Sequence, residues 1–331
     1  MTRGSDINTP KLKMDIFKHL FGANPKDASS LLPAIELAVS KVEPLLKQTH
    51  NYPNAYRKPV MTALEYAHSL AHSLPGPVAV NLDSYSNDAY VHAIFPSMSF
   101  VSEALQASKA IQDYLREHQA SNEAYALMGM RCSEKVLMGM KLSGQVIQKE
   151  VPQQVVYFTD HTIVDPAPTE SEARNRVALG FLNNLVGKVA MRVALRKKEI
   201  HSQLQELDLL KAHLHRASAE SSPALEIELS KMLSSIQATT RTLDLHSYLD
   251  DFEAVLLNPE QHLYLEQSTI ILDSMGGKLD SAGADQGETI IFNDLIGFDR
   301  RNWTVTMVHC HNLQRQTFAE RLEIAYRSLT I

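Results

Sequence analysis

The stretch ALEIELSKMLSSIQATTRTL, residues 224–243, decides our interpretation of the fold. Leucine and other compatible residues recur in it at spacings of four and three. This heptad pattern is typical of a helix that packs along a second helix. The residues of this stripe are Leu225, Leu229, Met232, Ile236, Thr239 and Leu243. The sequence therefore predicts one half of a helical hairpin.

The other half is expected directly upstream of this stretch. Thr169, followed three residues later by Glu172, matches the capping box that begins a helix. No proline occurs from there to Pro223, so a helix of about 70 Å is possible at 1.5 Å per residue. Its expected inward residues are Leu182, Leu185, Val189, Ile200, Leu204, Leu207 and Leu214. We predict an antiparallel, coiled-coil-like hairpin over residues 169–257, with a short polar turn.

The first predicted helix is basic over residues 174–198. Between Ala173 and Lys198 it contains no Asp or Glu. Such a face could bind nucleic acid or another anionic surface, which is our alternative functional hypothesis. Its candidate anion-binding residues are Arg192, Arg196, Lys197 and Lys198.

The second predicted helix contains acidic residues that can pair with these basic side chains. Its last part contains Asp244, Asp250, Asp251 and Glu253. If the turn centres near residue 220, the basic and acidic stretches lie side by side. We predict at least two ion pairs between residues 188–198 and 244–253, which would set the register of the hairpin. This arrangement disfavours nucleic acid as a partner, although it remains possible.

Two β-rich regions flank the hairpin. Residues 125–142 alternate with a period of two, interrupted by an expected turn at Cys132-Ser133-Glu134, and Val155–Thr159 is a further β-rich run. Residues 262–311 contain the second strand set. Because a hairpin returns the chain to its starting point, we predict that both sets share one antiparallel sheet.

Helical patterns occupy the start and the end of the chain. Residues 14–118 are read as helices, with a stop at Pro75-Gly76-Pro77 and a last helix over Met98–Glu117. A final helix is expected over Leu313–Leu329. The predicted fold class is α+β. The predicted domains are a flexible N-terminus (1–13), a helical domain (14–120), a sheet domain (121–168 with 258–331) and the hairpin insertion (169–257).

Composition restricts the class of protein. The chain has 331 residues, a net charge of −6 and two cysteines, which argues against a disulfide framework and against a protein that coats nucleic acid. The most apolar stretch, Val177–Leu195, includes Lys188 and Arg192. We therefore expect a cytoplasmic protein without a membrane span.

Histidines near the end of the last strand are candidate metal ligands. Alternation places His309 and His311 on one face and Cys310 on the other. With His161 they are the candidate site of a metal-assisted enzyme, our second alternative. Two histidines supply only two ligands, whereas a metal site needs a third and usually a fourth. We therefore predict that His309 and His311 do not hold a metal.

The remaining candidate site is Asp299 with Arg300 and Arg301, whose paired guanidinium groups suit a phosphate or carboxylate. No phosphate-cradling glycine motif and no nucleophile with its base is recognisable. The sequence therefore favours a non-enzymatic interaction or assembly protein without a cofactor. Its hairpin would bind a partner protein or a second copy.

Overall fold

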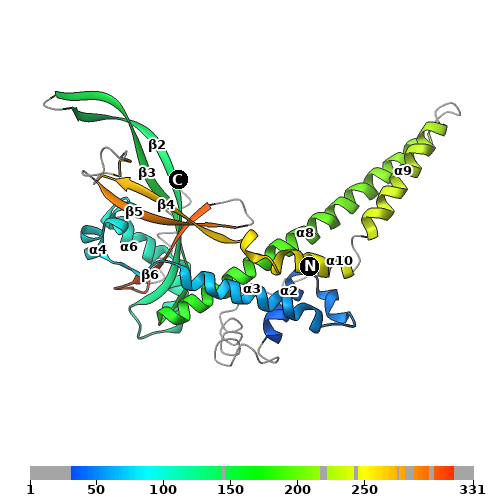
Figure 1. Ribbon diagram of the computed structural model, residues 1–331, viewed down its shortest axis with the longest axis horizontal. Coiled ribbons are helices and arrows are strands. Elements are labelled where there is room, and N and C mark those ends of the chain that lie inside the picture. The colour runs from blue at the N-terminus through cyan, green and yellow to red at the C-terminus, as the bar shows by residue number, and fades with distance from the viewer. Residues whose placement is uncertain are drawn as a thin grey trace. The chain divides into compact units, whose positions relative to one another are not determined.

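The computed structural model describes residues 31–143, 146–216, 222–241, 245–273, 276–279, 287–297 and 302–316. They form an α+β fold, as predicted (Figure 1). The chain divides into two compact units. One contains the described parts of residues 1–66 and 182–262, and the other those of residues 67–181 and 263–331. Helices α3 (Asn54–Ser73) and α8 (Glu170–Leu214) contribute residues to both units.

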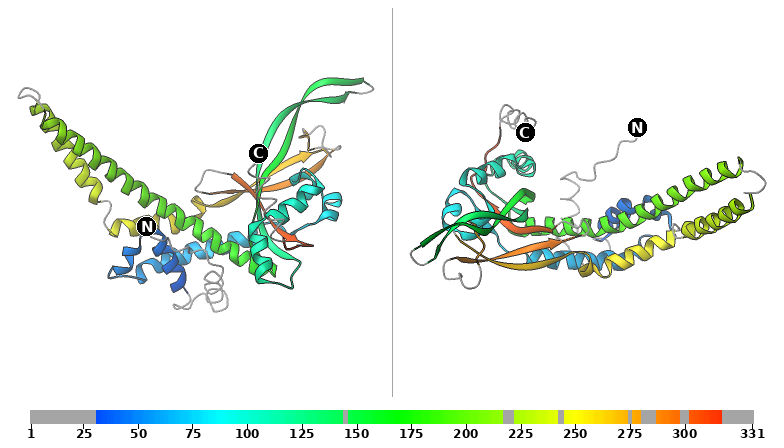
Figure 2. Two further views of the ribbon diagram at one scale, coloured as in Figure 1. Left: turned by 180° about the vertical axis from the view of Figure 1, so that it is seen from behind. Right: turned by 90° about the horizontal axis from the view of Figure 1, so that it is seen from above.

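The first unit is helical. Besides its parts of α3 and α8, it contains α2 (Leu32–Val42), η1 (Pro44–Gln48), α9 (Ser222–Arg241), α10 (Leu245–Leu256) and η2 (Pro259–Gln261). Helices α8 and α9 lie side by side and run antiparallel (Figures 1 and 2). The predicted helical hairpin is therefore present in the structure.

The inward stripe of α9 is the predicted one. Ile236 is buried, and Leu225, Leu229, Met232 and Thr239 are half-buried, whereas every residue between them is exposed. Leu243 lies outside the described residues. The heptad pattern of α9 is confirmed wherever its side chains are described.

The inward stripe of α8 differs from the prediction at one position. Leu204 is 43% exposed, and Gln203 occupies its expected place. One series of buried and half-buried positions recurs at spacings of three and four, so the inward position after Ile200 is 203. They are Val193, Arg196, Ile200, Gln203, Leu207, Leu210 and Leu214. The polar residues Arg196 and Gln203 were overlooked because only apolar residues were counted.

The base of the hairpin packs against the N-terminal helices of its unit. The rings of Tyr56 on α3 and Phe252 on α10 meet edge to face, with centroids 5.1 Å apart. Lys41 donates to the backbone oxygen of Asn183 at 2.7 Å. This part of the hairpin therefore shares a core with α2 and the first part of α3.

The second unit is built on a six-stranded sheet with the order β3-β2-β6-β5-β4, and β1 pairs with β6. Its strands are β1 (Val78–Val80), β2 (Ala124–Ser143), β3 (Val146–Ala167), β4 (Tyr264–Leu272), β5 (Glu288–Ile296) and β6 (Asn302–Cys310). β2 and β6 pair antiparallel, which confirms that the two strand sets share one sheet. The short β1 runs parallel to β6 inside the region that was predicted to be helical.

Four short helices pack against one face of this sheet: α4 (Leu82–Asn87), α5 (Ala89–Ile94), α6 (Met98–Ala107) and α7 (Lys109–Glu117). Their buried side chains, such as Ile94 and Leu115, share one core with Met128, Phe292 and Val308 of the strands. The single helix predicted over Met98–Glu117 is two helices, because the side chain of Ser108 caps α7.

The turn predicted at Cys132-Ser133-Glu134 is wrong. β2 continues through it to Ser143 and pairs with β3 along its whole length. The three residues include no glycine, proline or asparagine, so nothing in them forces a turn. Beyond residue 131 the two strands leave the other strands of the sheet (Figure 1). We call this two-stranded part, residues 131–143 and 146–159, the ribbon.

Several predictions fall on residues that are not described. They include the flexible N-terminus, the hairpin turn near residue 220, Asp244 and most of the C-terminal helix. Of that helix, residues 313–316 are described, and they are not helical.

Candidate functional site

The basic residues of α8 at the hairpin base lie against acids of their own unit. Arg196 and Arg192 approach the Asp251 carboxylate at 2.8 and 3.9 Å. The Asp251 side chain is only 5% exposed. Burial raises its pKa, and the two arginines oppose that shift. At least two ion pairs join the predicted segments, so this prediction is confirmed.

The neighbouring lysines differ in their surroundings. Lys197 forms an ion pair with Glu43, between α2 and η1, and this pair lowers the pKa of Glu43. Lys188 lies 2.9 Å from the ring of His262. Lys198 is exposed. The four predicted anion-binding residues therefore do not form a common free face, because three of them are paired with acids.

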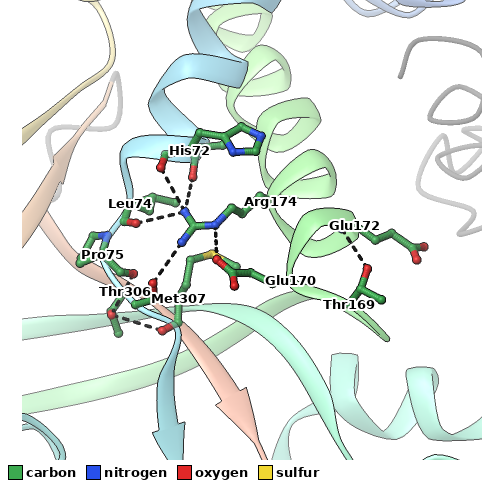
Figure 3. A network of polar contacts seen from close by, with 11 residues as sticks. His72, Leu74, Pro75, Thr169, Glu170, Glu172, Arg174, Thr306 and Met307 are labelled. Carbon is green, nitrogen blue, oxygen red and sulfur yellow. Dashed lines mark hydrogen bonds and ion pairs between the residues drawn. The ribbon is translucent and has the colours of Figure 1, made fainter. Parts of the chain in front are cut away.

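The side chain of Arg174, at the start of α8, is buried in the second unit and joins α8 to the end of α3 (Figure 3). Its side chain is 8% exposed and pairs with Glu170 at 2.7 Å. The guanidinium also donates to the backbone oxygens of Ala71, Leu74 and Gly76 at 2.8, 3.0 and 3.2 Å. It thus satisfies carbonyl groups at and beyond the end of α3, which otherwise lack helical partners.

Asp299, Arg300 and Arg301 lie outside the described residues, so the anion site predicted there stays a prediction.

His309 of β6 and His311, directly after that strand, lie close to an acid that the sequence did not suggest. His309 Nε2 and His311 Nδ1 lie 3.2 and 3.7 Å from Glu123 Oε2. The His309 ring also stacks on Tyr125, with centroids 4.0 Å apart. Burial, followed by the neighbouring His311, lowers the pKa of His309, and Glu123 opposes this shift. Cys310 is fully buried on the other face, as alternation predicted, and burial raises its pKa to about 12.

His161, the third predicted ligand, belongs to a different environment. Its Nε2 lies 2.7 Å from the backbone oxygen of Ile94, and its ring stacks on Phe95 and meets Phe100 edge to face. Burial lowers its pKa. The structure therefore brings His309 and His311 together with Glu123 and places His161 in the helix–sheet core.

The second unit also has an open cavity of ≈890 Å³ between α4, α5 and strands β3 to β5. Its polar lining includes Tyr85, Asp88, His92, Tyr157 and Asp273. Glu288 is a third carboxylate of the lining, and the other two already accept structural hydrogen bonds. Asp88 caps α5, and Asp273 accepts from the backbone of Gly277 at 2.8 Å. The lining therefore suits binding more readily than acid–base chemistry.

The ribbon exposes three consecutive large apolar side chains. Val136, Leu137 and Met138 are 63, 53 and 71% exposed. They pair with Gln154, Gln153 and Pro152 of β3. Since neighbours in a strand point to opposite faces, Val136, Met138 and Pro152 lie on one face and Leu137 on the other. The sequence signal was this run of three apolar residues, which we had interpreted as an ordinary strand.

The helical hairpin also exposes apolar side chains, but they are dispersed. Leu209 on α8 and Ile227 on α9 are exposed and point away from the inward stripes. By length and composition, α8 alone among the described helices could cross a membrane, and half of its most apolar stretch is buried. The core helix of a soluble protein passes the same test, so the absence of a membrane span stays a prediction.

Comparison of the chain with protein-family models, with curated proteins and with solved structures found no match.

Proposed function

We propose that this is a non-enzymatic interaction protein and that its ribbon binds a partner protein through apolar side chains. The observation behind the proposal is the exposure of Val136, Leu137 and Met138 in consecutive positions of a two-stranded segment. A partner that covers them removes apolar surface from water, which stabilises a complex by about 25 cal/mol per Å². Contiguous exposed apolar patches commonly mark such interfaces.

The form of the ribbon supports this proposal. Two strands form hydrogen bonds to each other but cover neither of their own faces, and such a pair has little stability alone. Near the sheet, Lys278 adds backbone and side-chain contacts, donating to Gln154 O and pairing with Glu134 at 2.7 Å each. Val136 lies opposite Gln154, and Leu137 and Met138 lie beyond these contacts, where a partner protein would cover one or both faces.

The helical hairpin is the second binding arm in this proposal. Leu209 and Ile227 would contact a partner or a second copy on the outer side of the two helices. Nucleic acid is the less favoured partner, because Arg192 and Arg196 already face Asp251 and the chain is acidic overall.

Capture of a partner from an extract of the protein's own cells tests the proposal. The bait would be the full chain, compared with a variant in which Val136, Leu137 and Met138 are all replaced by Ser. The matched control replaces Leu45 and Ile291 by Ser, because these apolar residues are 54% and 53% exposed and lie outside both arms. Sedimentation of each purified chain measures self-association separately.

We expect the ribbon variant to lose at least about ten-fold of the captured partner, because the central apolar residues of an interface usually dominate its binding energy. Circular dichroism checks that both variants remain folded. Equal capture by the ribbon variant and the unaltered chain would contradict the proposal.

A further inference from the structure

The cluster of Glu123, His309 and His311 has the donor set of a metal site. Two imidazole nitrogens and one carboxylate oxygen lie within 4.8 Å of one another. In a tetrahedral zinc site, ligand atoms about 2.1 Å from the ion are separated by about 3.4 Å. The distances of 3.2 and 3.7 Å from Glu123 Oε2 to the two histidines are already close to that value. A small rotation of the rings would close the remaining gap.

The backbone holds these three side chains from several directions. His309 lies between two strands, opposite Tyr125 of β2 and Ala79 of β1. The backbone oxygen of Glu123 accepts hydrogen bonds from Tyr114 Oη at 3.3 Å and from Ser121 Oγ at 2.7 Å. Ligands on such a fixed scaffold lose little freedom when they bind an ion.

The segment after β6 is fixed in the same way. The backbone nitrogen of His311 lies 3.5 Å from Val80 O, and that of Leu313 donates to Asn122 O at 2.8 Å. Asn122 is the residue directly before Glu123, so this hydrogen bond joins the two segments that supply the ligands. The cluster is therefore part of the sheet framework.

We propose that Glu123, His309 and His311 bind one divalent first-row transition metal ion, such as zinc, through Oε2, Nε2 and Nδ1. Imidazole ligands favour such ions over magnesium and calcium, which prefer oxygen ligands. Three protein ligands leave at least one coordination position for water or a small ligand. His311 also lines a cavity of ≈160 Å³ with Asn81, Gln106 and Asn312, which offers space for that position.

This proposal replaces the expectation from the sequence that His309 and His311 hold no metal. That expectation counted two ligands from one strand. Glu123 adds a third from the position directly before β2, which the pairing of Ala124 with Cys310 brings close to the two histidines. The site is also independent of the ribbon, because it does not use residues 131–159.

Metal titration of the full chain tests the proposal. The chain would first be freed of metal with a chelator and then titrated with zinc by calorimetry. Cobalt would be followed by its visible d–d absorption, whose intensity distinguishes a four-coordinate ion in a protein site from the six-coordinate ion in water. We expect one equivalent to bind in the micromolar range or tighter, and magnesium not to compete.

Variants assign the binding to the cluster. His309→Ala and His311→Ala should each weaken zinc binding by at least about 100-fold, and Glu123→Gln by at least about ten-fold, since each removes a direct ligand. His50→Ala is the matched control, because it removes an exposed histidine of the other unit, and its affinity should not change.

Two results would overturn the proposal. One is the absence of saturable binding to the unaltered chain, which needs no variant at all. The other is unchanged affinity in the cluster variants. If His309→Ala does not fold, the more exposed His311 and Glu123 still decide the question.

Discussion

The helical hairpin and the ribbon are both long two-segment elements, but they differ in where their apolar side chains lie. The hairpin places Ile200, Leu207 and Ile236 inward, and each is buried. The ribbon leaves Leu137 and Met138 in solvent. Two helices bury a stripe of side chains between them, whereas two paired strands meet edge to edge and cover neither face.

This difference separates stability from binding. The inward residues of the hairpin stabilise their own unit, so their type and spacing are explained without a partner. The exposed apolar residues of the ribbon, Val136, Leu137 and Met138, have no comparable role in the folded chain. An exposed run of this kind is therefore better explained by a surface that is buried only in a complex.

The largest expected effect is the contrast between one inward leucine and one ribbon methionine. Leu207→Ala should lower the free energy of unfolding by about 2–4 kcal/mol, because it removes packed methylene groups and leaves a cavity. Met138→Ala should change it by no more than about 0.5 kcal/mol, since the side chain is exposed. Urea unfolding followed by far-UV circular dichroism measures both. Leu209→Ala is the control, as an outward leucine of the same helix. A ribbon substitution as costly as Leu207→Ala would remove the distinction between the two arms.

A smaller effect is expected at the ion pairs of the hairpin base. Arg196→Ala should cost roughly 1 kcal/mol at pH 7, because it leaves the buried Asp251 carboxylate with only the distant Arg192. The Arg196 side chain is 33% exposed, so solvent screening limits the effect. Lys198→Ala, which alters an exposed neighbour, should have no measurable cost.

The pH dependence of this variant follows from the pKa of Asp251, which burial raises. As pH falls, Asp251 binds a proton at a higher pH in the folded chain than in the unfolded chain. Acidification from the pKa of the folded state towards that of the unfolded state therefore raises the free energy of unfolding. The neutral carboxyl no longer needs a counter-charge. The difference between Arg196→Ala and the unaltered chain should therefore shrink as pH falls through the pKa of Asp251. A difference that grows on acidification would show that Arg196 acts through another group.

The smallest effect is expected at the exposed ion pair of the ribbon, Glu134 with Lys278. Both side chains are more than one-third exposed, so a double-mutant cycle with Glu134→Gln and Lys278→Gln should give a coupling of at most about 0.5 kcal/mol. The coupling should disappear at about 1 M salt. A coupling above about 1 kcal/mol that persists at high salt would mean that this ion pair holds the ribbon in place.

The sequence predicted local patterns well and pairings between distant segments only in outline. The stripe of α9 follows from spacing along one helix, so Ile236 and its neighbours were identified correctly. The ribbon was missed because strand continuity through Cys132 depends on pairing with Phe158, which no local pattern reveals. The register that brings Glu123 near His309 is hidden for the same reason.

The central claim, that the ribbon is the binding arm, is tested most directly by photo-crosslinking in living cells. A photoreactive phenylalanine analogue would replace Met138 in one chain and Leu209 in another. We expect a discrete crosslinked protein from position 138, weakened when Val136 and Leu137 are also replaced by Ser. No crosslink at position 138, with a discrete one at position 209, would contradict the claim and make the helical hairpin the binding arm.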